Sequence, residues 1–233
     1  MTPPVHHAVL RRVWGSSSRA RHFEFQMANG QRFKFHAGQY ISLHTHLNGE
    51  GVARAYSIAA RQADDRLELC VNVSSGEDAW LLGLKRDEEV EFSGPFGSFE
   101  LRHPPGLVAA FIATGTGIAP IRAMIQELYR KYKPEEVWLI FGVRREADIL
   151  YREEFEKLAR VHPEFRFVPT LSRPDPGWMG RRGYVQEQIK KYLRGKEGLQ
   201  AYVCGSPAMV EQVRALLQTM GYDDDAVSFE RFE

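Results

Sequence analysis

Two adjacent prolines divide this chain into halves with different hydrophobic rhythms. The segment His103-Pro104-Pro105-Gly106 cannot continue a strand or a helix, because proline lacks a backbone N–H and has a fixed φ. Before it, short segments alternate apolar and polar residues, whereas after it apolar runs alternate with segments of helical spacing. The length of 233 residues has room for two small domains. We therefore expect one domain over residues 1–102 and a second over residues 107–233.

The first half carries many short strand signals. Residues 23–27 and 33–35 place apolar side chains at every second position, and Asn29-Gly30 between them is a hairpin signal. Further strands are expected over residues 40–43, 55–59, 67–73 and 90–92, and a short helix over residues 79–84. Short strands joined by turns predict an antiparallel barrel or sandwich.

The second half alternates strands with helices. Strands are expected over residues 107–113, 137–143, 165–171, 200–204 and 227–232, and helices over residues 118–132, 151–160, 184–192 and 207–220. The first strand is apolar throughout, as is typical of a strand buried on both faces. This order predicts an α/β domain with a doubly wound, five-stranded parallel sheet.

Composition argues against several classes of protein. The formal net charge is +1, without the basic excess of nucleic-acid-binding proteins, and no apolar run is long enough for a membrane span. The start of the chain lacks a secretory signal and the two cysteines cannot form a disulfide framework, so a cytoplasmic location is expected. Two cysteines are also too few for an internal [2Fe–2S] cluster. His44 and His46 share a strand face without a third ligand, so no metal site is expected.

The loop between the first buried strand and its helix has the composition of a phosphate site. It runs from Thr114 through Gly115, Thr116 and Gly117 to Pro120. Glycines let a backbone approach an anion closely, and the helix that follows presents free N–H groups. The residues alone leave a second interpretation open, a glycine-rich turn that binds nothing.

Five further motifs accompany this loop in a fixed order. They are Gly38-Gln39-Tyr40, Arg54-x-Tyr56-Ser57, Gly94-Pro95-Phe96-Gly97, Cys204-Gly205-Ser206-Pro207 and Glu230-x-Phe232. The whole series resembles the ferredoxin–NADP reductase superfamily, most closely the reductase modules of bacterial oxygenases, here without an iron–sulfur domain. The resemblance covers nearly all of the chain. It implies an N-terminal flavin-binding β-barrel and a C-terminal NAD(P)-binding α/β domain, with the flavin ring at their junction.

The resemblance also assigns residues to the flavin ring. It implies that Arg54 contacts the pyrophosphate, that Tyr56 packs on the isoalloxazine ring and that Ser57 hydrogen-bonds near its N5 atom. Phe232 resembles the terminal aromatic residue that shields the ring until nicotinamide displaces it, although Glu233 follows it here. The bound flavin is expected to be FAD, with FMN as the alternative.

The flavin tail is expected to contact Val71, Val73, Gly76 and Ala79. Here the sequence departs from the family, which usually has Ser or Thr where Ala79 stands. Glu77 and Asp78 also place negative charge near the expected pyrophosphate. These departures put the strength of flavin binding in question.

On the nicotinamide side, the resemblance implies that Ser57, Cys204 and Glu230 line the site of hydride transfer. The bland interpretation of Cys204 is a small buried hydrophobic residue. The residues expected to contact NAD(P)H are Thr114, Gly115, Thr116, Gly117, Pro120, Arg144, Ser172, Arg173, Arg182, Tyr184, Cys204 and Gly205.

The choice between NADP and NAD depends on arginines near the expected adenosine ribose. Ser172-Arg173, followed by Arg182 and Tyr184, resembles the pattern of NADP-using reductases, because several arginines can clamp a 2′-phosphate. Trp178-x-Gly180-Arg181 also resembles NAD-using modules. The sequence therefore favours NADP and leaves NAD open.

The expected activity is that of an NAD(P)H-dependent flavoprotein reductase. With two cysteines, the one-electron acceptor, such as ferredoxin or flavodoxin, has to be a separate protein. Two alternatives remain. One is a reductase of free flavin, quinone or ferric iron, and the other is a non-catalytic electron-transfer or regulatory subunit of a larger complex.

Overall fold

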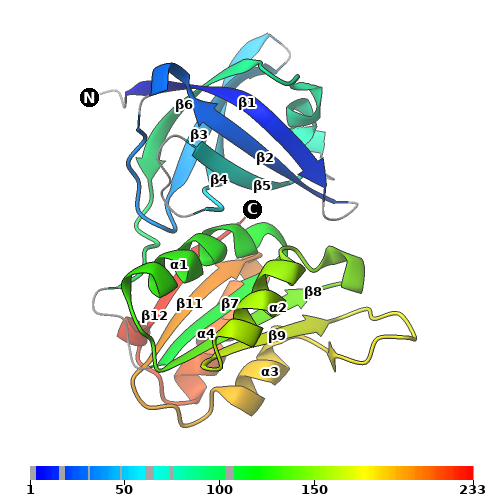
Figure 1. The fold of residues 1–233 in the computed structure, drawn as a ribbon. Coiled ribbons are helices and arrows are strands. Elements are labelled where there is room, and N and C mark those ends of the chain that lie inside the picture. Colours follow the sequence, from blue (N-terminus) through cyan, green and yellow to red (C-terminus); the bar gives the residue numbers. More distant parts are fainter. Residues whose placement is uncertain are drawn as a thin grey trace.

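The computed structural model describes residues 4–15, 19–30, 32–47, 49–60, 66–73, 76–102 and 108–232, and the side chains of Asn29 and Glu77 are not described. The chain forms two six-stranded sheets, one above the other in Figure 1. The proline-rich segment 103–106 lies outside the described residues.

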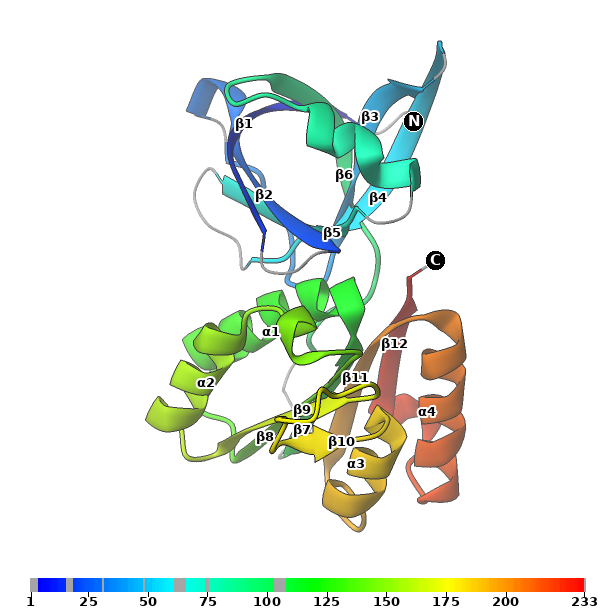
Figure 2. The same cartoon turned by 90° about the vertical axis from the view of Figure 1, so that its right-hand side faces the viewer.

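The first sheet is an antiparallel barrel, as the sequence predicted. Its strands are β1 (Val5–Gly15), β2 (Ala20–Met27), β3 (Tyr40–Leu47), β4 (Glu50–Ser57), β5 (Arg66–Asn72) and β6 (Glu89–Phe96), in the order β4-β3-β6-β1-β2-β5. A single bridge between Ile58 and Leu69 brings the two outer strands of this order together. The 3-10 helices are η1 (Ala28–Gly30) and η2 (Gly76–Gly83), and Figure 2 shows η2 beside the open end of the barrel.

The hairpin prediction at Asn29-Gly30 is wrong. Residues 28–30 form η1, and β2 pairs with β1 and β5 instead of with a strand at residues 33–35. Phe33 and Phe35 lie in an extended segment outside the sheet and are each 5% exposed. Their alternation therefore reflects burial in the barrel core, where Phe33 contacts the Phe92 ring edge-on, and not pairing of backbones.

The second sheet is parallel and contains all five predicted strands. These are β7 (Val108–Thr114), β8 (Glu136–Val143), β9 (Phe165–Leu171), β11 (Leu199–Gly205) and β12 (Val227–Arg231). A short sixth strand, β10 (Arg181–Arg182), pairs with Thr170 and Leu171 and had no signal in the sequence. The sheet order is β10-β9-β8-β7-β11-β12.

Helices cover both faces of this sheet. They are α1 (Ile118–Lys131), α2 (Arg152–Val161), α3 (Val185–Tyr192) and α4 (Pro207–Thr219), with the 3-10 turns η3 (Gly115–Gly117), η4 (Glu146–Asp148) and η5 (Asp224–Ala226). Phe111 on β7 packs in the core that α1 and α2 cover, whereas Ile112 packs in the core that α3 and α4 cover. Figure 2 shows the two helix layers on opposite sides of the sheet.

The core beneath α1 continues into the barrel. Ala59, Cys70 and Phe99 of the barrel belong to the same buried cluster as Ile121 and Met124 of α1. Figures 1 and 2 show α1 lying beneath the barrel and the end of β12 pointing toward it. The two halves therefore meet at a packed seam. Among the described residues, no helix is both long and apolar enough to cross a bilayer.

Candidate functional site

Three residues predicted to line a hydride-transfer site converge at this seam. Ser57 ends β4 of the barrel, and its Oγ donates a hydrogen bond to Oε2 of Glu230 at 3.3 Å. Glu230 lies on β12 directly opposite Cys204 of β11. Both sheets thus contribute to one site.

Burial controls the protonation of this site. Burial raises the pKa of Glu230 to about 7, although the hydrogen bond from Ser57 acts in the opposite direction. Burial and the nearby Glu230 carboxylate raise the pKa of the Cys204 thiol well above its ordinary value. Cys204 is therefore a neutral thiol near pH 7, and Glu230 is poised to exchange a proton near neutrality.

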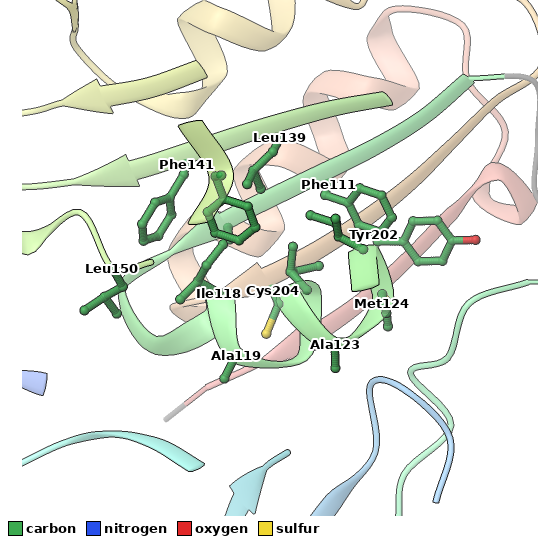
Figure 3. Close-up of a cluster of buried hydrophobic side chains, with 14 of the residues drawn as sticks. Phe111, Ile118, Ala119, Ala123, Met124, Leu139, Phe141, Leu150, Tyr202 and Cys204 are labelled. Carbon is green, nitrogen blue, oxygen red and sulfur yellow. The ribbon is translucent and has the colours of Figure 1, made fainter. Parts of the chain in front are cut away.

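Cys204 also belongs to the hydrophobic core. Its side chain is fully buried in the cluster that contains Ile118 and Ala119, and Figure 3 shows its sulfur directed away from the sheet. A Cβ on Gly117 would lie 2.5 Å from the Cys204 carbonyl oxygen, so only glycine fits there. The Cys204 side chain therefore packs in the core and also lies close to Glu230.

Two further motifs, Gly38-Gln39-Tyr40 and Gly94-Pro95-Phe96-Gly97, line the barrel side of the site. Tyr40 lies opposite Ser57 across β3 and β4, and the Gln39 side chain donates to the Gly97 carbonyl at 3.2 Å. A Cβ on Gly97, at φ +96°, would meet the Tyr40 ring at 3.1 Å and Oε1 of Glu230 at 4.0 Å. Because Gly97 has no side chain, its backbone can lie close to both the Tyr40 ring and Glu230.

The predicted phosphate loop follows β7, where the order in which strands are added to the sheet changes side. After β7 the chain adds β8 and β9 on one side and β11 and β12 on the other, which is the switch point where α/β sheets bind ligands. Gly115 has φ +55° and faces open space, since a Cβ there would meet no atom within 4 Å. Gly117 is the N-cap of α1 and brings no side-chain cap, so the positive end of the helix dipole faces this loop. The Ile118 N–H donates to the Gly115 and Thr116 carbonyls and Pro120 has no N–H, so neither of these residues offers an N–H to an anion. Pro120 is buried in the first turn of α1.

Three more predicted residues reach the same end of the sheet. Gly205, at φ +156°, approaches Thr114 so closely that a Cβ would lie 2.2 Å from its Oγ1. The backbone N–H of Phe232 donates to the Gly205 carbonyl at 2.8 Å. Phe232 is half-buried against the core of the seam.

The predicted adenosine-binding residues gather at the carboxyl ends of β8 and β9. The backbone N–H of Ser172 donates to the Val143 carbonyl at 3.0 Å, and that of Arg173 donates to the Arg144 carbonyl at 2.9 Å. Arg144 and Arg173 are exposed. Arg182 follows on β10 opposite Leu171, and Tyr184 is 66% exposed at the start of α3.

On the barrel, Tyr56 has a contact that the sequence did not reveal. It is 8% exposed, and its hydroxyl donates to Oδ1 of Asp78 on η2 at 2.6 Å. Burial, together with the hydrogen bond and charge of Asp78, raises the pKa of Tyr56 well above its ordinary value. In the sequence, only the departure of Asp78 from the family pattern marks this residue.

The remaining flavin candidates lie around Tyr56. Arg54 lies two residues before Tyr56 on β4, so both side chains project from the same face of that strand. Across the sheet, Arg54 pairs with Leu43 and Tyr56 pairs with Ile41 of β3. Val71 is buried on β5 and Val73 packs at the edge of the barrel core, whereas Gly76 and Ala79 are exposed on η2.

Two cavities lie away from these residues. One of about 530 Å³ is lined by His44, His46, Trp80 and Glu91 on the barrel, and one of about 1040 Å³ is lined by Trp138, Phe167, Trp178 and Met179 along β9. Neither is lined by Ser57, Cys204 or Glu230. Within the described ranges, no group of three acidic, histidine or cysteine side chains could hold a metal ion.

Comparison with known proteins agrees with this geometry. The model of the oxidoreductase FAD-binding domain matches residues 8–101, and that of the oxidoreductase NAD-binding domain matches residues 111–215. The chain is 37% identical over 223 residues to ferredoxin–NADP reductase B of Sorangium cellulosum, covering 91% of each protein. It is 35% identical over 206 residues to the phenol 2-monooxygenase reductase component DmpP of Pseudomonas sp. strain CF600, covering 85% of this chain and 58% of that protein.

A solved structure supports the same assignment. The crystal structure of the Amycolatopsis cytochrome P450 reductase GcoB has a TM-score of 0.86 and 32% identity, covering 100% of this chain and 71% of that one. The chain thus spans nearly all of the Sorangium relative and little more than half of the Pseudomonas one. From its fold, both domain models and the near-full-length relative, the chain belongs to the ferredoxin–NADP reductase superfamily of FAD- and NAD(P)-binding oxidoreductases.

Proposed function

We propose that this protein takes electrons from NAD(P)H through bound FAD and passes them to a separate one-electron carrier such as ferredoxin or flavodoxin. The observation that carries this proposal is the convergence of Ser57, Glu230 and Cys204 from two sheets at one buried seam. Similarity to a ferredoxin–NADP reductase and to an oxygenase reductase component supports it.

The residues on the barrel fit a flavin. Gly76 opens onto empty space at the start of η2, where a Cβ would meet no atom within 4 Å. Arg54, Tyr56 and Ser57 would hold the pyrophosphate, the ring and the N5 edge, and Val71, Val73, Gly76 and Ala79 would line the tail. A bound flavin supplies the ability to take up a hydride and to release its electrons one at a time.

The chain itself positions and protects the reacting atoms. The Ser57 hydroxyl is a hydrogen-bond donor at the seam, and Glu230 holds or releases a proton near neutral pH. The buried Cys204 and the half-buried Phe232 exclude water from the same place. No strong acid or base is needed at the carbon that transfers hydride, so orientation is the main contribution of the protein.

For the nucleotide we propose NADP(H) in preference to NAD(H). Gly115, Thr116 and Gly117 would receive the diphosphate at the start of α1, next to Thr114, Pro120 and Gly205. The exposed Arg144 and Arg173 lie side by side at the carboxyl edge, where a 2′-phosphate could accept hydrogen bonds from them. Ser172, Arg182 and Tyr184 would complete this end of the site.

We also propose that the domains divide at residues 1–102 and 107–233, which agrees with the separate ranges of the two family models. Cys70 and Cys204 are free, buried thiols, and this supports a reducing compartment such as the cytoplasm.

One observation favours a second candidate, a reductase of free flavin. Asp78 places a carboxylate beside Tyr56, next to the expected pyrophosphate, and Ala79 offers no hydroxyl to it. Repulsion between Asp78 and a phosphate would weaken retention of FAD.

Reloading the purified protein with FAD and mixing it anaerobically with NADPH or NADH tests the proposal. We expect retained FAD, bleaching of its absorbance by NADPH, and transfer of electrons to added ferredoxin. Loss of flavin on desalting would favour the free-flavin reductase, and retained flavin that neither nucleotide bleaches would favour a non-catalytic subunit. A protein that binds no FAD would contradict the proposal.

A further inference from the structure

Arg122 joins the two halves of the molecule inside the seam. Arg122 of α1 is 13% exposed, and its Nη1 donates to the Ala59 carbonyl and to Oε2 of Glu68, both at 2.8 Å. Its Nε donates to Oε2 of Glu154 on α2 at 2.7 Å. Ala59 and Glu68 belong to the barrel, whereas Glu154 belongs to the second half. One guanidinium thus binds three oxygens on both sides of the seam.

Tyr151 and His22 complete this cluster. The Arg122 guanidinium lies 4.3 Å from the centre of the Tyr151 ring, and the Tyr151 hydroxyl donates to Oε1 of Glu68 at 3.1 Å. The same hydroxyl lies 3.0 Å from Nδ1 of His22, which is 1% exposed. Tyr151 has φ +55°, a backbone conformation that residues other than glycine rarely adopt. Such a residue persists only where its surroundings fix it, so the contacts around Tyr151 hold its backbone in this conformation.

Glu68 and Arg122 both stay charged in this cluster. Burial acts to raise the pKa of Glu68, but the hydrogen bond from His22 and the charge of Arg122 outweigh it and lower that pKa. Burial acts to lower the pKa of Arg122, and the carboxylates of Glu68 and Glu154 raise it. Removal of Arg122 would leave the buried Glu68 carboxylate without the guanidinium that it binds, which is strongly unfavourable.

The position of Arg122 links it to both sides of the proposed reaction site. Ala59 follows Ser57 by two residues, and its N–H donates to the Glu68 carbonyl at 2.7 Å. Arg122 lies one turn into α1, whose N-cap Gly117 contacts the Cys204 carbonyl. A shift of Arg122 relative to the barrel would therefore move Cys204 relative to Ser57.

We propose that Arg122 is a positioning residue for hydride transfer. By holding Ala59 and Glu68 against α1, it sets the spacing between Ser57 on the flavin side and Cys204 on the nicotinamide side. This inference rests on the proposed function. Misplacement of reacting groups by about 1 Å can cost roughly 100-fold in rate, so a small rotation of one half against the other is enough to matter.

The test compares Arg122→Met and Arg122→Lys with Arg130→Met. Arg130 lies on the same helix, is 48% exposed and pairs with Glu127, so its loss matches the change in charge without touching the seam. In FAD-loaded protein we expect flavin reduction by NADPH to slow roughly 100-fold in Arg122→Met and roughly tenfold in Arg122→Lys. Flavin content and the Kd for NADPH should stay near wild type, and the long-wavelength charge-transfer absorbance between flavin and nicotinamide should weaken. Arg130→Met should behave as wild type.

A second readout needs no cofactor. Cys204 is fully buried at the seam, so its alkylation rate, followed by peptide mass spectrometry, reports opening between the halves. We expect that rate to rise about tenfold in Arg122→Met and not in Arg130→Met. If Arg122→Met does not fold, Glu68→Met removes the carboxylate oxygens that Arg122 and Tyr151 bind and keeps a side chain of similar length. Wild-type alkylation and wild-type flavin reduction in the Arg122 variants would overturn the inference. A wild-type protein that no nucleotide reduces would instead overturn the proposed function, and alkylation of Cys204 would then decide on Arg122.

Discussion

Ser57 of the barrel donates a hydrogen bond across the seam to Glu230 of the second sheet, with 3.3 Å between Oγ and Oε2. The two residues are far apart in sequence and come from unlike folds. Their contact places a hydroxyl donor next to a carboxyl group whose pKa is raised to about 7 by burial. The seam therefore contains a group that titrates in the physiological range.

We expect this titration to appear in stability. The pKa of Glu230 is about 7 in the folded chain, against a usual value of 4.5. The folded state therefore favours the protonated carboxyl, and this contribution is complete below pH 4.5 and lost as pH rises through 7. The loss is at most roughly 3 kcal/mol, and each kcal/mol moves Tm by roughly 2–4 °C in a chain of this size.

Thermal melts of ligand-free wild type and Glu230→Gln at pH 5 and pH 8 measure this effect. Wild type should lose more stability than Glu230→Gln between the two values. The Ser57→Ala protein should retain the difference, because burial is the main cause of the raised pKa. Equal pH dependence in wild type and Glu230→Gln would show that Glu230 ionises freely.

The sequence predicted the elements that have local signals. The apolar run of β7, the glycines that follow it and the helical spacing of α1 occur within one continuous stretch, and their structure agrees with the prediction. The same reasoning failed at Phe33 and Phe35, because burial in a barrel imitates the alternation of a paired strand. β10 has two residues, too few to carry a pattern.

Side-chain contacts across the fold had no comparable signal. Only the resemblance to a family brought Ser57, Cys204 and Glu230 together before the structure did. Two of these contacts depend on how separate elements pack. They are the hydrogen bond from Tyr56 to Asp78 and the hydrogen bond from Arg122 to Glu68. Arg122 appears in the sequence as one more polar residue of an amphipathic helix, and docking of the barrel is what buries it.

Cys204→Ala separates packing from positioning. The substitution leaves a small space beside Ile118 and Ala119, so we expect a stability loss of about 1–2 kcal/mol. If Cys204 also orients the nicotinamide, flavin reduction by NADPH should slow about tenfold with flavin content unchanged. Stopped-flow reduction measures the rate, and Val213→Ala, a buried residue of α4 in the core on the other face of the sheet, is the control that should lose only stability. Unaltered reduction in Cys204→Ala would limit this residue to packing.

Arg173→Ala tests the preference for NADP. Charge-assisted hydrogen bonds to a phosphate contribute about 1.5–3 kcal/mol, so the KM for NADPH should rise roughly 10- to 100-fold. The KM for NADH, which lacks the 2′-phosphate, should change little. Arg166→Ala, near the opposite end of β9, removes the same charge away from Arg144 and should leave both constants near wild type. Equal rises for NADPH and NADH would remove Arg173 from the 2′-phosphate site.

Asp78→Asn tests whether a carboxylate beside Tyr56 weakens flavin binding. The asparagine Oδ1 can still accept the hydrogen bond from the Tyr56 hydroxyl, so the substitution removes charge and keeps the contact. We expect the Kd for FAD to fall about threefold to tenfold at low salt, and the gain to shrink as salt screens the pyrophosphate. Riboflavin, which has no phosphate, should bind both proteins alike, and Glu50→Gln at the far end of β4 should leave FAD binding unchanged. Quenching of flavin fluorescence measures each Kd. Weaker FAD binding in Asp78→Asn would show that the charge of Asp78 supports the flavin site, most simply by holding the Tyr56 ring in place.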